Sequence, residues 1–326
     1  MEEKEEEKYL GDILSKDGKN IKNIKARVSK GTGIVNRIMT LLNGIPVGKF
    51  YFEIALMLRN SLLVSSVLCN SESWYNVTNG ELDYLESVDL MLLRKLLQAP
   101  KSTPKEMLYL ELGCLPLREI IRKRRLSFLF YILGQDPESL ISRFFKTQLN
   151  NRSEKDWVTT VLKDLEELNW NVSFEDIKQM KKASFIRILK QRIETKALAD
   201  LEKVKSGHSK VKHLKHGKLK IQSYLLPNTE KISKEEMQMI FKLRCRVTDL
   251  KTNMKGIYDS YECKICENEE ETQEHILKCK GINNEENQVK YEDIFSGTAK
   301  EKMKVAKCFK ENMKIRDNLM KAKNAG

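Results

Sequence analysis

At 326 residues the chain is long enough for about two domains, and its formal net charge of +13 favours an anionic partner such as nucleic acid. It contains only 15 Gly and 6 Pro, which argues against extended disorder and favours helices. No run of about 18 apolar residues is present, so the sequence excludes a membrane-spanning helix and gives no reason to expect a membrane partner.

The N-terminal sequence and the number of cysteines indicate the cellular compartment in which the protein is expected. The opening sequence, Met-Glu-Glu-Lys-Glu-Glu-Glu-Lys, is acidic and therefore unlike a signal peptide. The seven cysteines are odd in number and mostly scattered, as expected for a protein in a reducing environment. We expect an intracellular protein, in the nucleus or the cytoplasm.

The first 135 residues combine a short hairpin signal with long helical patterns. Residues 9–17 alternate weakly between polar and apolar and end at Lys16-Asp17-Gly18, a turn signal. Apolar residues then recur at helical spacing over 21–42. The segment 50–68 is apolar almost all round, which predicts a buried central helix. Further amphipathic helices are predicted at 81–97, at 118–133 and, as shorter units, over 138–200.

Lysine and arginine gather in three places where they can neutralise phosphates and release counterions. The segment Lys203–Lys220 has seven Lys, three His and no acidic residue, which predicts a basic linker. A helix is predicted after the capping-box pattern of Ser233 and Glu236. The predicted nucleic-acid contacts in these two places are Lys210, Lys212, Lys215, Lys218, Lys220, Lys242, Arg244, Arg246 and Lys251. The third place is the helix 118–133, with Arg122, Lys123, Arg124 and Arg125, where a solvated face is an equally open interpretation. Aromatic residues, at 7%, do not predict a base-stacking platform.

Near the C-terminus, Cys263, Cys266, His275 and Cys279 have the spacing of a zinc site. Two cysteines three positions apart can hold one ion from a tight turn. With Thr272 as N-cap, His275 and Cys279 lie four apart on one face of a short helix. The intervening residues are almost all polar, so the turn needs a metal ion to become ordered.

The number of ligands predicts the role of that ion. A catalytic zinc site keeps one position open for water and has three protein ligands, whereas here four residues fill a tetrahedral shell. The sequence therefore predicts one structural Zn²⁺ ion. No second quartet of ligands is present for a double-zinc module.

Taken together, four motifs resemble the region that follows the catalytic core in non-LTR retrotransposon reverse transcriptases. The run Tyr9-Leu10-Gly11-Asp12-Ile13-Leu14-Ser15-Lys16-Asp17-Gly18 resembles the end of the palm and the start of the thumb. Residues 68–74 (Leu-Cys-Asn-Ser-Glu-Ser-Trp) resemble a thumb segment, and 121–126 (Ile-Arg-Lys-Arg-Arg-Leu) resemble an Arg-Arg-Leu helix. The Cys/His cluster resembles the C-terminal zinc knuckle of that family.

The resemblance implies a mainly α protein: a thumb-like helical bundle with a short N-terminal β-hairpin, followed by a small zinc-stabilised module. Tyr9, Leu10 and Gly11 would be a remnant of the primer-grip hairpin. The implied parts are a palm remnant (1–18), a thumb-like domain (19–135), a helical connector (136–202), a basic linker (203–232), a basic helix with the zinc knuckle (233–282) and a Lys-rich helix (283–326).

Polymerisation requires carboxylates that hold two metal ions, and the chain contains no Asp-Asp pair. We therefore expect a non-catalytic region that binds element RNA or an RNA/DNA primer-template, and whose further partner is the catalytic part of the same element's polymerase. Two alternatives stay open. One is a host-adopted protein–protein adaptor with a structural zinc site, and the other is a hydrolase that uses Glu or His near the zinc.

Overall fold

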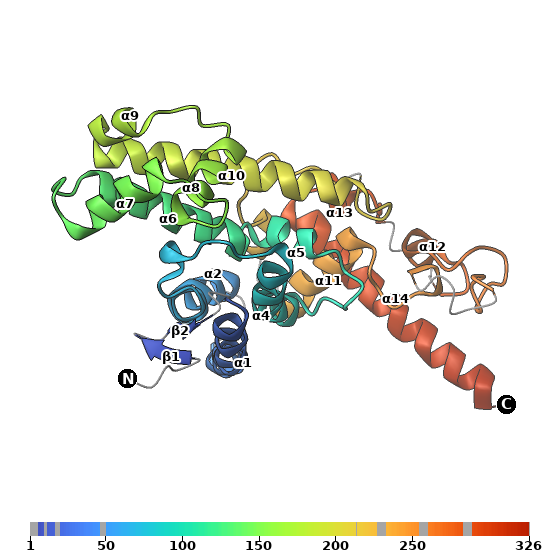
Figure 1. The fold of residues 1–326 in the computed structure, drawn as a ribbon. Helices are drawn as coiled ribbons and strands as arrows, with labels where there is room; N and C mark the ends of the chain where they lie inside the picture. The colour runs from blue at the N-terminus through green and yellow to red at the C-terminus, as the bar shows by residue number, and fades with distance from the viewer. Residues whose placement is uncertain are drawn as a thin grey trace. The chain divides into compact units, whose positions relative to one another are not determined.

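The computed structural model describes residues 6–9, 12–16, 20–45, 50–212, 214–226, 233–253, 260–282 and 289–325. These residues are mainly helical, with one two-stranded sheet and a Cys/His cluster near the C-terminus, which confirms the predicted fold class (Figure 1). Leu10 and Gly11, two of the three primer-grip-like residues, lie outside the described residues, and Tyr9 ends strand β1 (Glu6–Tyr9). No helix within the described ranges has the length and apolarity to cross a membrane.

The chain forms two compact units, and each is assembled from separate stretches of sequence. Unit 1 comprises Met1–Leu41, Leu56–Leu92 and Cys114–Asp200, and unit 2 comprises Leu42–Ala55, Leu93–Gly113 and Leu201–Gly326. Contacts between distant stretches of the chain define these two units, and the consecutive parts expected from the sequence stay a prediction.

In unit 1, strand β1 pairs antiparallel with β2 (Asp12–Ser15), and Tyr9 lies opposite Asp12. The paired residues are 6–9 and 12–15. Asp17 and Gly18, part of the turn predicted from the sequence, lie outside the described residues.

Asp12 fastens this hairpin to helix α1 (Ile21–Asn43). Its carboxylate accepts hydrogen bonds from Asn23 Nδ2 at 2.8 Å and Asn70 Nδ2 at 2.9 Å, and it forms an ion pair with Arg27. Burial alone would raise the pKa of Asp12, but these donors outweigh burial and lower it. The hairpin is thus held to unit 1 by a charged, multiply bonded side chain.

The apolar segment predicted as one helix over 50–68 has three parts. Helix α2 (Tyr51–Leu58) leads into a π-helical turn, η1 (Arg59–Val64), and then α3 (Ser65–Val67). Arg59 is almost completely buried and forms a two-pronged ion pair with Asp89 of α4 (Asn79–Leu97), with both N–O distances at 2.6 Å. A buried arginine is tolerated only with such a partner.

The second half of unit 1 encloses a hydrophobic core. The 3-10 turn η2 (Ser71–Ser73) contacts α6 (Leu117–Leu133), which also contacts α7 (Leu140–Asn150), α8 (Trp157–Glu167) and α9 (Phe174–Gln179). Helix α10 (Lys182–Ser206) contributes Phe185, Leu189 and Ile193 to the same core. Ser139, Asp156 and Ser173 cap α7, α8 and α9 with side-chain oxygens.

Unit 2 contains the helices around the Cys/His cluster. They are α5 (Lys105–Leu112), α11 (Lys234–Cys245), α12 (Gln273–Lys278), α13 (Asp293–Ser296) and α14 (Ala299–Ala325), with the short 3-10 turns η3 (Ser223–Leu225) and η4 (Lys251–Asn253). Helix α14, red in Figure 1, packs against α11, α12 and α13. The capping box predicted at Ser233 and Glu236 is present at the start of α11.

The described part of the segment predicted as a basic linker packs into unit 2. Val211 and Leu214 are buried, and the backbone N–H of Gln222 donates to the carbonyl oxygen of Glu111 at 3.0 Å. Gly113, which ends α5 with φ +63°, has no room for a side chain, because a Cβ there would lie 1.9 Å from the carbonyl carbon of Lys220. The segment therefore lies along the end of α5 with its apolar residues inward.

Candidate metal centre

Cys263 and Cys266 lie on a tight turn held by backbone hydrogen bonds. The N–H of Cys263 donates to the carbonyl oxygen of Glu269 at 2.8 Å, and the N–H of Glu267 donates back to the carbonyl oxygen of Cys263 at 2.8 Å. Glu267 adopts a left-handed φ of 56°, which reverses the chain directly after Cys266. This closed loop places both thiols on the same side of the turn.

The other two candidate ligands come from the short helix α12 and its end. Thr272 is the N-cap, as predicted, and its Oγ1 accepts a hydrogen bond from the N–H of His275 at 3.0 Å. His275 lies in the first turn of α12, and Cys279 is the C-cap residue. The helix therefore positions these two side chains on the face that meets the cysteine turn.

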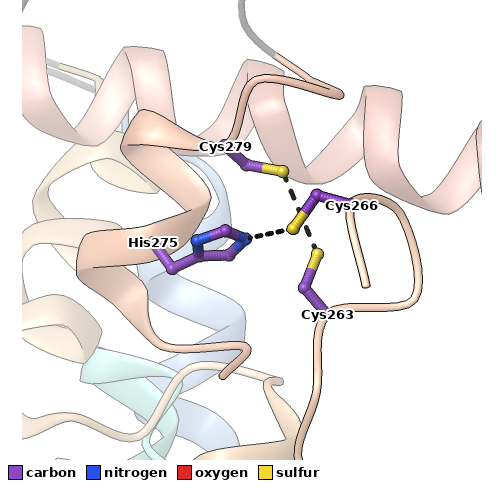
Figure 2. A group of neighbouring side chains, drawn as sticks. All are labelled: Cys263, Cys266, His275 and Cys279. Carbon is purple, nitrogen blue, oxygen red and sulfur yellow. Dashed lines mark hydrogen bonds between the residues drawn. The ribbon is translucent and has the colours of Figure 1, made fainter. Parts of the chain in front are cut away.

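The four side chains converge (Figure 2). Their ligand atoms all lie within 4.8 Å of one another. Cys266 Sγ is 3.3 Å from His275 Nε2, and Cys263 Sγ is 3.9 Å from Cys279 Sγ. Cys263, His275 and Cys279 are buried, and Cys266 is half-buried. Three sulfurs and one imidazole nitrogen at this spacing could hold a metal ion.

A fifth residue orients the histidine. Glu269 Oε2 lies 3.1 Å from His275 Nδ1, which leaves Nε2 directed towards the three thiols. Metal-bound histidines commonly donate their second ring nitrogen to a carboxylate in this way. Glu269 was not singled out from the sequence, because it belongs to a run of similar acidic residues and nothing distinguished it from Glu270.

The local electrostatics differ between two of the thiols. Burial opposes ionisation of Cys266, but backbone N–H groups of Asn268 and Glu269 donate to its sulfur and lower the pKa. Burial, reinforced by the neighbouring Cys263, raises the pKa of Cys279 to about 12. Three sulfurs this close together repel one another when they are ionised. A bound cation supplies the opposite charge that offsets this repulsion.

The cluster is attached to the rest of unit 2 by three hydrogen bonds. Lys251 Nζ donates to the carbonyl oxygen of Glu262 at 2.9 Å, and Thr252 Oγ1 donates to that of Glu271 at 2.7 Å. On the other side, Asn312 of α14 donates to the carbonyl oxygen of Ile276 at 2.9 Å. The knuckle (residues 260–282) is therefore part of the unit 2 framework.

The cationic residues predicted on helix α6 have partners in unit 1. Arg122 forms ion pairs with three carboxylates, among them Asp164 at 3.1 Å, and Arg125 binds the same Asp164 at 2.6 Å. Arg124 donates to a backbone carbonyl oxygen and Lys123 is half-buried. Two of the four cations are thus neutralised within the unit, and their contact with nucleic acid stays a prediction.

The cationic residues predicted on and after α11 are also engaged. Arg244 is buried, and Arg246 pairs with Glu274 at 2.9 Å. Lys251 is buried beneath the knuckle, and burial lowers the pKa of the half-buried Lys242. Arg244, Arg246 and Lys251 therefore make contacts within unit 2, and their contact with nucleic acid stays a prediction.

The basic segment, Lys203–Lys220, differs from helices α6 and α11 in the exposure of its predicted contacts. Lys212, Lys215, Lys218 and Lys220 are exposed, while Lys210 is half-buried and donates to the carbonyl oxygen of Asn253 at 2.8 Å. Exposed and buried positions alternate along this stretch, because the apolar residues and His216 face inward. The four exposed lysines are the predicted contacts that solvent reaches most freely.

A buried polar network in unit 2 was not predicted. Glu111 is completely buried at the end of α5, where its carboxylate lies 3.0 Å from Arg244 Nη2, 3.0 Å from His216 Nε2 and 2.6 Å from the hydroxyl of Tyr224. Burial would raise the pKa of Glu111, but Arg244 and His216 hold it at about 2. Glu202 lies 2.9 Å from the other ring nitrogen of His216. In the sequence, the one sign of this network is a single acidic residue, Glu111, near the end of the apolar run that forms α5.

No family model, curated protein or solved structure matches the chain. The resemblance to non-LTR retrotransposon reverse transcriptases therefore rests on the order of the motifs in the sequence alone.

Proposed function

We propose that the chain is a non-catalytic, nucleic-acid-binding region of a retrotransposon-type reverse transcriptase, in which one zinc ion orders the knuckle. Four ordered, exposed lysines on the basic segment carry the binding role. The resemblance motivates the partner, which is element RNA or an RNA/DNA primer-template.

The donor set supports zinc as the ion. Thiolate sulfur and imidazole nitrogen suit Zn²⁺, and four protein ligands close a tetrahedral shell. With no position left for water, the ion would supply structure and not catalysis: Cys263, Cys266, His275 and Cys279 would bind it, and Glu269 would hold the imidazole in place.

The lysines support phosphate binding because their backbone is fixed. Val211 and Leu214 are buried on either side of Lys212, and His216 is buried beside Lys215. Cations held on an ordered segment lose less conformational freedom when they meet a phosphate than cations on a flexible tail. Each phosphate that a lysine neutralises also releases counterions.

The proposed role sets the expected partners and compartment. Without a pair of catalytic aspartates in this chain, copying depends on a polymerase core supplied by the same element, which becomes the second expected partner. A nucleic-acid role also suits the nucleus or the cytoplasm.

The test is the salt dependence of binding. We expect the slope of log K against log salt concentration to fall by about 0.7–0.9 for each phosphate contact removed. A variant with Lys212, Lys215, Lys218 and Lys220 changed to Gln should lose about 3 units of slope on an RNA/DNA hybrid. The matched control replaces four exposed lysines of unit 1, Lys25, Lys30, Lys178 and Lys181, with Gln.

Equal loss of slope in both variants would show that charge alone, and not the basic segment, determines binding. Affinity that stays flat between low and moderate salt would reject nucleic-acid binding. In that case, a protein partner that co-purifies after nuclease digestion would favour the adaptor role.

A further inference from the structure

Unit 1 carries an aromatic groove that the proposed function does not use. The groove, a cavity of about 330 Å³, lies among η2, α6, α7 and α8. Its aromatic lining consists of Tyr75, Phe128, Phe144, Phe145 and Trp157. The ring of Phe144 is 61% exposed at the rim, whereas Trp157, at 8%, forms the floor. The volume lies at the lower end of the range of small-molecule sites, about 300–1,000 Å³.

The floor of the groove is held rigidly. Trp157 Nε1 donates to the carbonyl oxygen of Glu72 at 2.8 Å, which fixes the indole ring. Phe128 packs edge-on against Trp157, with ring centroids 5.8 Å apart, and stacks nearly parallel to Tyr131 at 6.0 Å. Tyr131 is 54% exposed, so this stack reaches the surface. Flat, preordered rings of this kind present faces on which other planar rings can stack.

Exposed cationic side chains lie on helix α7 and on the loop that follows it, where the exposed Glu154 lies between Arg152 and Lys155. Helix α7 contains no acidic residue, and its two cationic residues, Arg143 and Lys146, are exposed. Arg152 and Lys155 on the following loop are exposed too, and Lys155 lines the groove. Asp156, the acid in the lining, accepts backbone N–H groups of Ser153 at 2.7 Å and Thr159 at 2.6 Å. Its charge is therefore directed to the start of α8 and not to the groove.

We infer that this groove binds bases of a single-stranded nucleic acid, with Phe144 and the neighbouring rings stacking on the bases and the surrounding lysines and arginines following the phosphates. Exposed aromatic rings beside a cationic path are the combination that single-strand binding requires. Paired bases of a duplex are already stacked and cannot enter the groove. The inference rests on the proposed function and adds to it the strand state of the nucleic acid.

The exposed aromatic residues of the groove could not be recognised from the sequence. Leu140 and Phe144 lie four positions apart on α7 and are 84% and 61% exposed, although that spacing ordinarily marks a core-facing stripe. The buried face of α7 includes Phe145, one position further on. Spacing alone therefore does not distinguish the exposed Phe144 from a core residue.

The experiment compares the full-length wild type with Phe144→Ala by fluorescence anisotropy, using a 12-nucleotide single-stranded RNA and a blunt RNA duplex. Loss of one stacked base should weaken single-strand binding about tenfold, with little effect on the duplex. Tyr84→Ala is the matched control, because Tyr84 is a 44% exposed aromatic residue of α4 in the same unit that does not line the groove. Phe144→Tyr, which keeps a ring, should retain wild-type affinity.

The outcomes separate the inference from the proposed function. Unchanged single-strand affinity in Phe144→Ala, with the lysine variant of the basic segment still impaired, would overturn the inference alone. A protein that survives nuclease digestion and is lost only from Phe144→Ala, with RNA affinity intact, would show that the groove is a protein-docking surface and would also overturn the inference. If neither nucleic acid binds the wild type, both proposals are wrong.

Discussion

Unit 2 contains two clusters of polar side chains, and the chain brings the members of each cluster together in a different way. In the knuckle, Cys263 and Cys279 are only 16 positions apart, and the intervening turn brings them together. In the buried network, Glu111 meets Arg244 across 133 positions, and only the packing of α5 against its surroundings joins them. The second cluster contains its own cation, Arg244, whereas we propose that the first binds a cation from outside the chain.

This difference determines how each cluster depends on its surroundings. The turn between Cys266 and Thr272 is made of polar residues, and we propose that its order is linked to metal binding. The network lies within the apolar core of unit 2, where an unpaired charge is costly and the pair itself contributes little net stability. Metal removal should therefore disturb one cluster and leave the other intact.

The largest expected effect follows from disrupting the metal ligands. Cys279→Ala should abolish tight metal binding, which in small zinc modules is worth about 10–16 kcal/mol, and should leave the amides of 260–282 unprotected in hydrogen exchange. Protection in α5 and α11 should persist. Cys69→Ala, at an exposed cysteine of unit 1, is the control and should change neither. Simultaneous loss of protection in all three regions would show that the two clusters are not separable.

Removing the acid of the network should cost less. Glu111→Ala leaves Arg244 buried without its carboxylate and should lower the free energy of unfolding by about 3–5 kcal/mol, measured by urea denaturation. The double variant Glu111→Leu, Arg244→Met removes both charges and should recover most of that loss. Glu138→Ala, an exposed acid, should stay within about 0.5 kcal/mol of the wild type. A double variant that is less stable than Glu111→Ala would contradict the ion-pair account.

The pH dependence gives a somewhat smaller effect. The pKa of Glu111 falls from 4.5 to about 2 on folding, so its contribution is fully present above pH 4.5 and is lost as the pH falls towards 2. A depression of this size corresponds to about 3 kcal/mol. Glu111→Gln should therefore lose stability less steeply than the wild type between pH 5 and pH 2, in urea midpoints measured across that range. Parallel curves would show that Glu111 does not titrate as described.

The smallest expected effect concerns the orientation of the imidazole. Glu269→Gln weakens the acceptor for His275 Nδ1 and should reduce metal affinity by about 10–100-fold, measured by competition with a chromophoric chelator. Glu270→Gln is the matched control from the neighbouring position. Equal effects of the two substitutions would indicate that general negative charge, and not the Glu269 contact, favours the ion.

The sequence predicted the features that depend on residues close to one another in the chain. The spacing of the knuckle cysteines, the N-cap Thr272 and the capping box at Ser233 depend on neighbours within a few positions, and the structure contains all three features. The division into units, the Glu111 network and the Glu269 contact depend on the tertiary fold. Arg122 illustrates the limit, because a helical cation looks the same in sequence whether solvent or Asp164 faces it.

The central claim, that the Cys/His cluster holds one structural zinc ion, is tested most directly by native mass spectrometry of the purified full-length chain. We predict one zinc ion per chain in the wild type and none in Cys266→Ser. Wild-type protein that carries no zinc, and that does not take it up from a buffered supply while its knuckle amides stay protected, would contradict the account.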